Sequence, residues 1–320
     1  MIPGHEPCNP MVDPDIRRLL DTVFSAQASD AAPDVARLRA AAEQAPLLLG
    51  GAPESLASVI EVEIIEGVKS IAGRVYRPDA DSSLPLVLYA HGGGWVTGSL
   101  DSHDRLCRLL ANRLRAIFLA VDYRRAPEDL YPAALDDFET AWHWARAHAR
   151  ELGADVGRPA VAGDSSGGNL AAALTLRLRA QSHEQPRLQL LLYPALDATC
   201  SRDSYRKFTA GFNLSAAQMA WYWNVYRGTA PVDAPELSPL ACEDLSALAP
   251  ALVAVADCDV LRDDGLDYAR RLGDAGVPVH LIRCEEMIHG FLRWTGAVPG
   301  ALRHVQRIAD ASRELLAGRH

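Results

Sequence analysis

A serine flanked by glycines is the first feature of this 320-residue chain that could do chemistry: residues 163–167 read Gly-Asp-Ser-Ser-Gly, with Ser165 at the centre. The pattern G-x-S-x-G is short, and a plain turn between a strand and a helix would also satisfy it. Its context favours a nucleophile, because a strand is predicted over residues 159–162 and a helix from Asn169 onward. A serine at such a turn exposes its hydroxyl, and small neighbours allow the sharp bend.

A run of glycines lies upstream, where residues 91–95 read His-Gly-Gly-Gly-Trp directly after a strand predicted at 86–90. Acyl transfer needs fixed donors for the negative charge that develops on the carbonyl oxygen, and consecutive glycines let bare backbone N–H groups face a ligand. A flexible hinge or a phosphate-binding loop is the alternative, but this run does not have the G-x-x-x-x-G-K-[ST] spacing of the latter. We therefore interpret it as part of an oxyanion hole, made by the N–H groups of Gly93, Gly94 and Ser166.

A serine hydroxyl becomes a nucleophile only when a base takes its proton, so a histidine and an orienting carboxylate are expected downstream, in the order Ser, Asp, His. His289 follows a strand predicted at residues 279–284. Four candidate acids follow the strand predicted at 251–256, namely Asp257, Asp259, Asp263 and Asp264. Because the carboxyl ends of parallel strands meet at one edge of a sheet, these groups are predicted to converge on Ser165.

The rest of the sequence indicates the scaffold that would position these groups. Two helices are predicted in the first fifty residues, then a pair of short strands, then strands alternating with helices. Such alternation predicts an α/β fold, a mostly parallel sheet covered by helices on both faces. About fifty residues without a clear core strand interrupt it. We expect an N-terminal helical cap segment at 1–50, a core at 51–197, a cap insertion at 198–248 and the remaining core at 249–320.

Composition narrows the classes of protein. The chain is 49% hydrophobic and 23% charged, which is typical of a globular domain, and its net charge of −9 argues against nucleic acid or anionic lipid as a partner. Six cysteines without a C-x-x-C pair indicate neither a zinc site nor a redox dithiol, and the start of the chain does not read as a secretory signal. The most apolar stretch is about half the ~20 residues of a membrane helix. We expect a cytoplasmic protein with no membrane span.

Six motifs, in this order, resemble those of the bacterial hormone-sensitive-lipase-like esterases: HGGGW at 91–95, VDYRRAPE at 121–128, YPAALDD at 131–137, GDSSGG at 163–168, DVLRDDG at 259–265 and MIHGF at 287–291. The resemblance runs from about Pro10 to Ala317. It implies an α/β-hydrolase fold with an eight-stranded sheet, flanking helices and a helical cap. It also implies that Ser165 is the nucleophile, His289 the base and Asp259 the acid.

The resemblance further implies a serine carboxylesterase that acts on esters with short to medium acyl chains, without a metal or organic cofactor. An amide, lactone or N-formyl hydrolase using the same residues is the alternative, and a catalytically silent small-molecule receptor is a remote one. The pocket is expected to involve Trp95, Phe212, Trp221 and Tyr222, and a homodimer is plausible by resemblance. Residues 123–128 are expected to buttress the site, so that Glu128→Gln lowers stability more than the chemical rate.

Overall fold

A single eight-stranded sheet organises the computed structural model, which describes residues 11–23, 34–80 and 83–318. In space the strands follow the order β1-β2-β4-β3-β5-β6-β7-β8. Two pairings are antiparallel, that of β1 with β2 and that of β2 with β4, and the other neighbouring strands are parallel. The bounds are β1 Ser58–Glu66, β2 Lys69–Arg77, β3 Leu84–Ala90, β4 Ile117–Val121, β5 Ala154–Asp164, β6 Gln189–Leu192, β7 Ala251–Cys258 and β8 Val279–Ile288.

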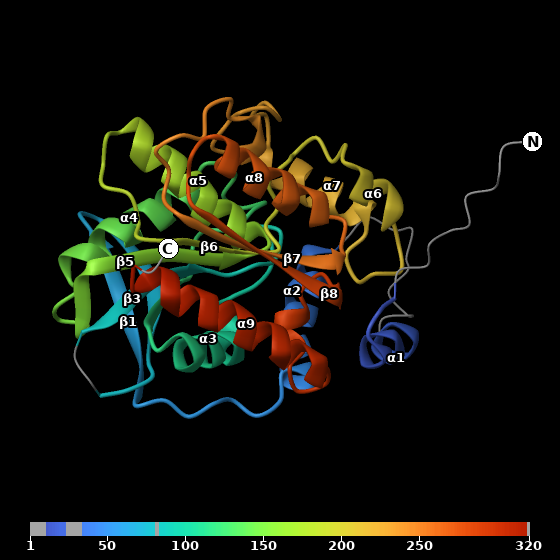
Figure 1. Cartoon of the computed structure of the whole chain (residues 1–320), viewed down its shortest axis with the longest axis horizontal. Coiled ribbons are helices and arrows are strands. Elements are labelled where there is room, and N and C mark those ends of the chain that lie inside the picture. Colours follow the sequence, from blue (N-terminus) through green and yellow to red (C-terminus); the bar gives the residue numbers. More distant parts are fainter. Residues whose placement is uncertain (1–10, 24–33, 81–82, 319–320) are drawn as a thin grey trace, which may run out of the picture.

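Helices cover both faces of this sheet, as the alternating pattern predicted (Figure 1). One face carries α4 (Ala133–Ala147), α5 (Ser166–Ala180) and α8 (Arg262–Asp274), and the other carries α3 (Leu100–Leu114) and α9 (Pro299–Leu316). Every residue of β3, β4 and β6 is buried, because these central strands are covered on both sides and so read as continuous apolar runs. The fold is therefore that of an α/β hydrolase.

Further helices gather at the end of the sheet toward which β7 and β8 point (Figure 1). From the N-terminal region come α1 (Pro14–Thr22) and α2 (Val35–Leu49), and from the segment between β6 and β7 come α6 (Asp203–Lys207) and α7 (Ala216–Arg227). The 3-10 turn η2 (Pro239–Ala241) belongs to the same segment and lies against α5 and α8. A capping box, in which Ser215 and Gln218 satisfy each other's backbone N–H groups, starts α7. Residues 198–248 contain helices and turns and no strand.

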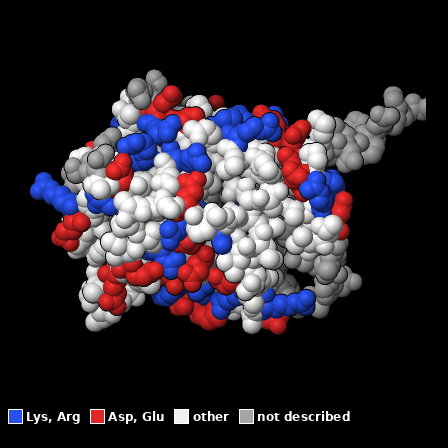
Figure 2. All heavy atoms as spheres, turned by 90° about the horizontal axis from the view of Figure 1, so that it is seen from below, with Lys and Arg blue, Asp and Glu red and all other residues white. Residues whose placement is uncertain are grey.

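The surface carries charges of both signs. On the face seen in Figure 2, basic and acidic side chains are interspersed around a broad uncharged area. Within the described ranges, no helix is both long and apolar enough to cross a membrane.

Candidate active site

Ser165 lies on a sharp turn between β5 and α5 and has the left-handed backbone angle φ of 56°. Such a conformation costs a side-chain-bearing residue ~1–3 kcal/mol and persists only where the surroundings enforce it. Here the Ser165 N–H donates to the carbonyl of Leu192 at 2.8 Å. Strand and helix approach so closely that a Cβ on Gly163 would lie 2.2 Å from the backbone of Gly167, and one on Gly167 would lie 2.0 Å from the Ala90 carbonyl oxygen. The glycines are therefore required for the turn.

His289 reaches Ser165 because of an irregularity in the pairing of β7 with β8. The register shifts between Ala256 and Cys258, and Cys258 then pairs with Ile288, so that the next residues on the two strands are Asp259 and His289. The Asp259 Oδ2 and His289 Nδ1 atoms are 2.7 Å apart, and His289 Nε2 is 2.9 Å from Ser165 Oγ. All three side chains are buried. This row can accept the hydroxyl proton of Ser165 and stabilise the resulting imidazolium.

The structure also discriminates among the four aspartates that the sequence left open. Asp257 forms an ion pair with Arg283 at 3.0 Å and faces away from this row, so Asp259 alone of the four contacts His289. The second oxygen of Asp259 accepts the N–H of Leu261 at 3.0 Å, which fixes the carboxylate. A proton on His289 Nδ1, directed at Asp259, leaves Nε2 as the acceptor that faces Ser165.

Several backbone donors near Ser165 are unused. The N–H groups of Gly93, Gly94 and Ser166 donate to no acceptor among the described residues, and Ser166 is the first residue of α5, where a helix leaves its N–H groups unpaired. Gly94 has φ of 61°, and the Tyr222 ring packs so closely that a Cβ there would lie 2.2 Å from it. The glycine run thus brings bare backbone amides under an aromatic ring.

Asp164, the residue before Ser165, joins the glycine run to the strained turn. Its Oδ1 accepts the Gly92 N–H at 2.8 Å and the Tyr89 hydroxyl at 2.6 Å, and His103 Nε2 lies 3.4 Å away. Burial acts to raise the pKa of Asp164, but the charge and hydrogen bond of His103, with the hydrogen bond from Tyr89, hold the pKa below its usual range. The carboxylate is therefore a buried anchor for the glycine run.

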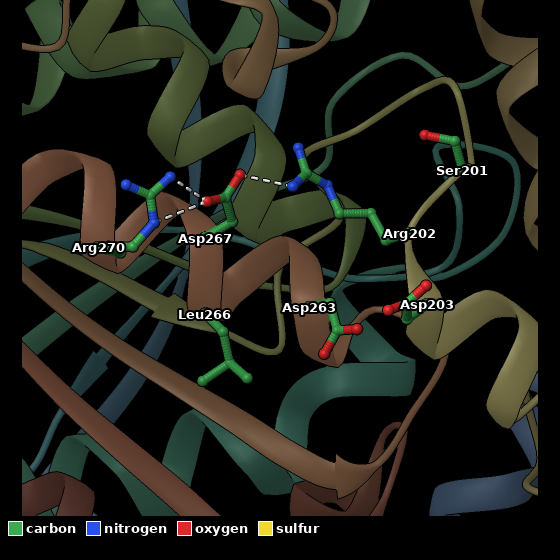
Figure 3. Close-up of a pocket in the computed structure, with 7 residues that line it drawn as sticks. All are labelled: Ser201, Arg202, Asp203, Asp263, Leu266, Asp267 and Arg270. Atoms are coloured by element: carbon green, nitrogen blue, oxygen red, sulfur yellow. Dashed lines mark hydrogen bonds and ion pairs between the residues drawn. The ribbon is translucent and has the colours of Figure 1, made fainter.

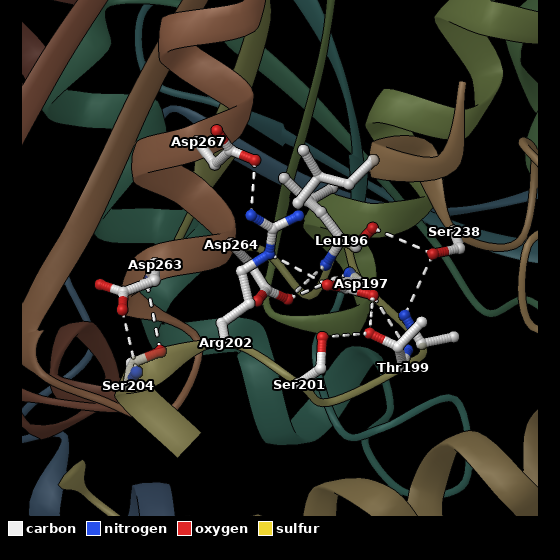
Figure 4. Close-up of polar contacts among 12 residues, drawn as sticks. Leu196, Asp197, Thr199, Ser201, Arg202, Ser204, Ser238, Asp263, Asp264 and Asp267 are labelled. Carbon is white, nitrogen blue, oxygen red and sulfur yellow. Dashed lines mark hydrogen bonds and ion pairs between the residues drawn. The ribbon is translucent and has the colours of Figure 1, made fainter. Parts of the chain in front are cut away.

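The segment between β6 and β7 is fastened to the loop that carries Asp259 (Figure 4). The Ser204 hydroxyl donates to the Val260 carbonyl at 2.5 Å, and the Ser204 N–H donates to Asp263 at 2.9 Å. The buried Asp264 accepts the N–H groups of Leu196 and Asp197 at 3.0 and 3.1 Å. Burial, the largest influence, holds the pKa of Asp264 well above its usual range. These bonds couple α6 and the segment that follows β6 to the loop after β7 and the start of α8.

A cavity of about 170 Å³ opens over Ser165. Four apolar side chains of α2 form one wall, Leu38, Ala41, Ala42 and Ala45. The other lining residues are Gly93, Gly94, Thr97, Asp164, Asn213, Leu214, Gln218, Met219, Tyr222, His289, Gly290, Arg293 and Trp294. A volume below the ~300–1,000 Å³ of common ligand pockets suits a small substrate.

Of the four aromatic residues expected at the pocket, the structure brings only Tyr222 to this cavity. Trp95 is a correction, since it is fully buried and its ring stacks on Tyr226 with centroids 4.4 Å apart. Phe212 packs edge-on against Phe208, and Trp221 does not line the cavity either. The Trp95 and Phe212 rings thus pack against other aromatic rings and do not line the cavity.

Sequence reasoning expected an N-terminal cap segment but named none of the α2 residues that line the cavity, and it missed Asp164 and Arg293 as site residues. The signal for Asp164 was its place beside the serine, and for Arg293 its place four residues after His289. A wall of alanines on a distant helix gives no local signal.

A larger hollow of about 610 Å³ lies on the outer side of α8 (Figure 3). It is lined by Ser201, Arg202, Asp203, Asp263, Leu266, Asp267 and Arg270. Arg202 and Arg270 both pair with Asp267, so its charges satisfy one another. In the described part of the chain, no three His, Cys, Asp or Glu side chains are arranged to hold a metal ion. The cavity over Ser165 is therefore the candidate active site.

Comparisons with known proteins agree with this fold. Residues 87–293 match a family described as having the α/β hydrolase fold. The chain is 40% identical over 294 residues to the carboxylic ester hydrolase LipN of Mycobacterium tuberculosis, covering 88% of this chain and 77% of that protein. It is 41% identical over 249 residues to the ethyl acetate hydrolase of Pseudomonas putida, covering 76% and 78%.

Solved structures give the same result. An esterase from the archaeon Pyrobaculum calidifontis superposes with a TM-score of 0.90 at 37% identity, over 96% of this chain and 99% of that one. Sequence and structure therefore place the chain in the hormone-sensitive-lipase-like family of α/β hydrolases, as a carboxylic ester hydrolase.

Proposed function

We propose that this enzyme hydrolyses esters with short to medium acyl chains through an acyl-enzyme on Ser165. The observation that carries the proposal is the continuous row of hydrogen-bonded groups, with 2.9 Å between Ser165 Oγ and His289 Nε2 and 2.7 Å between His289 Nδ1 and Asp259. The small cavity supports a short acyl chain, as does the similarity to an ethyl acetate hydrolase.

In the first half of the reaction, His289 takes the Ser165 proton while Oγ attacks the ester carbonyl carbon. The N–H groups of Gly93, Gly94 and Ser166 would hold the oxyanion, a contribution of ~2.7–4 kcal/mol for one donor in another serine hydrolase. Asp259 stabilises the imidazolium, which then gives its proton to the departing alcohol. Water repeats these steps on the acyl-enzyme and releases the acid.

The cap is part of the proposal. We infer that residues 1–50 and 198–248 act as a helical cap over a core of residues 51–197 and 249–320, because α2 and α7 contribute cavity-lining residues. Of the first range, residues 1–10 and 24–33 lie outside the part of the chain that the structure describes. The cytoplasmic location and the homodimer stay predictions.

A panel of 4-nitrophenyl esters from acetate to laurate, with the matched acetanilide, tests this function. We expect the highest kcat/KM among the shorter acyl chains, little turnover of the anilide, and loss of turnover in Ser165→Ala. Equal or faster turnover of the anilide would favour the amide-hydrolase alternative. Undiminished ester turnover in Ser165→Ala would refute the proposed nucleophile.

A further inference from the structure

Among the residues that the structure describes, Arg293 lines the cavity over Ser165 without a partner for its side chain. Arg293 lies in η3 (Phe291–Trp294), the short turn that follows His289. Its side chain folds back along this turn, because Nη2 lies 3.4 Å from the position that a Cβ on Gly290 would occupy. The guanidinium is thus beside the backbone of the residue that follows His289.

The side chain of Arg293 makes no hydrogen bond to any described residue, and no described carboxylate lies within 4.0 Å of it. Its Nε is buried and unpaired. Other partly buried arginines are used differently: Arg177 pairs with three carboxylates and Arg202 with two. A guanidinium is always charged, and leaving its donors unsatisfied in a partly closed site is unfavourable.

Asp164 is the acidic residue that also lines the cavity, and its charge acts on Arg293 only at a distance. Arg293 helps to lower the pKa of Asp164, after His103, but the hydrogen bonds of Asp164 go to Tyr89 and Gly92. The Nη donors of Arg293 therefore stay available to a ligand, whereas Nε is closed off.

Two amide side chains that line the cavity also carry N–H donors. The Asn213 amide donates to the His289 carbonyl at 3.2 Å, which places it at the same end of the cavity. The Gln218 carbonyl oxygen is occupied by the N–H of Ser215, and its NH₂ group donates to no described residue. The Asn213 amide therefore lies beside Arg293, and the Gln218 amide lines the same cavity, whereas the α2 wall is apolar.

Resting on the proposed esterase function, we propose that the preferred substrates are small esters that carry a carboxylate, which forms an ion pair with Arg293. A planar guanidinium matches a carboxylate with two parallel hydrogen bonds, and the Asn213 amide lies close to this guanidinium. The ester carbonyl then lies at Ser165, and the carboxylate orients the substrate in the cavity.

Two pairs of esters test the substrate class, with the carboxylate in the acyl part or in the alcohol part. The first pair is monoethyl glutarate and ethyl pentanoate, and the second is 4-acetoxybenzoate and 4-methylphenyl acetate. The measured quantity is the ratio of kcat/KM, charged over neutral, within each pair. Arg293→Met should lower this ratio ~10-fold or more in at least one pair, because a charge-assisted hydrogen bond is worth at least one factor of ten. Arg293→Lys should retain part of it.

Arg206→Met is the matched control, because it also removes one positive charge but from an exposed position in α6. Its ratios should equal those of the wild type. If Arg293→Met does not fold, Arg293→Gln replaces it in the same comparison.

A decrease smaller than ~10-fold in both pairs would overturn the proposal while leaving the esterase function intact. If the wild type hydrolyses none of the four esters, the proposed function itself is refuted.

Discussion

The buried carboxylate of Asp164 allows a sharp test of how the glycine run is held in place. Asp164→Ala removes the acceptor of two buried donors, the Tyr89 hydroxyl and the Gly92 N–H. Each unsatisfied donor costs ~1–3 kcal/mol, so we expect the free energy of unfolding to decrease by ~2–6 kcal/mol. Asp164→Asn keeps an acceptor and only replaces charge-assisted bonds by neutral ones of about half the strength, so a loss of ~1–3 kcal/mol is expected.

Activity should respond through the backbone. Gly92 leads directly into Gly93 and Gly94, so a displaced Gly92 moves the N–H groups proposed to hold the oxyanion. Loss of one such donor lowers kcat ~10²–10³-fold with little change in KM. The kcat of Asp164→Ala should fall by an amount in this range. The kcat of Asp164→Asn should fall ~10-fold or less, because the amide still accepts a hydrogen bond and only the charge-assisted part of the contact is lost.

The assay combines urea unfolding with steady-state hydrolysis of 4-nitrophenyl acetate. Asp264→Asn is the control, because Asp264 is equally buried but burial raises its pKa well above the usual range, so the amide removes less charge near neutral pH. We expect this control to cost less stability than Asp164→Asn. A kcat of Asp164→Ala within ~3-fold of the wild type would refute the anchoring role, since even one weak donor lost exceeds that.

Three further variants test other contacts. Burial, with the charge of His103, lowers the pKa of His91 to about 3, so the unfolded state binds more protons than the folded state below pH ~6.5, and the free energy of unfolding should fall by ~2 kcal/mol from pH 7 to pH 5. His91→Gln should remove this part of the decrease, measured by urea unfolding at several pH values; an unchanged dependence of stability on pH would contradict it. Hydrogen bonds from Arg39 lower the pKa of Glu128 to about 2, so this exposed pair stabilises the folded state above pH ~4.5 and loses its effect as the pH falls toward 2. Glu128→Gln should therefore lower stability by ~0.2–1 kcal/mol at pH 7, seen as a lower melting temperature, and leave kcat unchanged. A collapsed kcat with an unchanged melting temperature would contradict this expectation. Ser204→Ala removes the hydrogen bond to the Val260 carbonyl and should lower the free energy of unfolding by ~0.5–1.5 kcal/mol. Because Val260 follows Asp259, kcat should fall more than KM changes; the reverse pattern in steady-state kinetics would count against a role of Ser204 in positioning Asp259.

Much of the fold could be predicted from the sequence because its signals are local. Central strands covered on both faces must be continuous apolar runs, and Leu84–Ala90 is buried at every position. The turn at Ser165 needs small neighbours, which the motif at 163–167 displays directly. The chain order of serine, acid and histidine then limited the search to the ends of two later strands.

What the sequence could not supply depends on how distant segments meet. The choice of Asp259 over Asp257 needed the resemblance, and its geometric reason is a register shift that no periodicity reveals. Trp95, the residue after the glycine run, was expected at the pocket, but its stacking partner Tyr226 comes from a helix far along the chain. Likewise, only the folded structure reveals that the Arg293 side chain has no partner among the described residues.

The most direct test of the central claim is identification of the residue that reacts with a fluorophosphonate probe, by mass spectrometry of the labelled, digested protein. We predict a single adduct on the peptide that contains Ser165, and slower labelling in His289→Ala with the protein still folded. An adduct on another residue, or equally fast labelling in His289→Ala, would contradict the account.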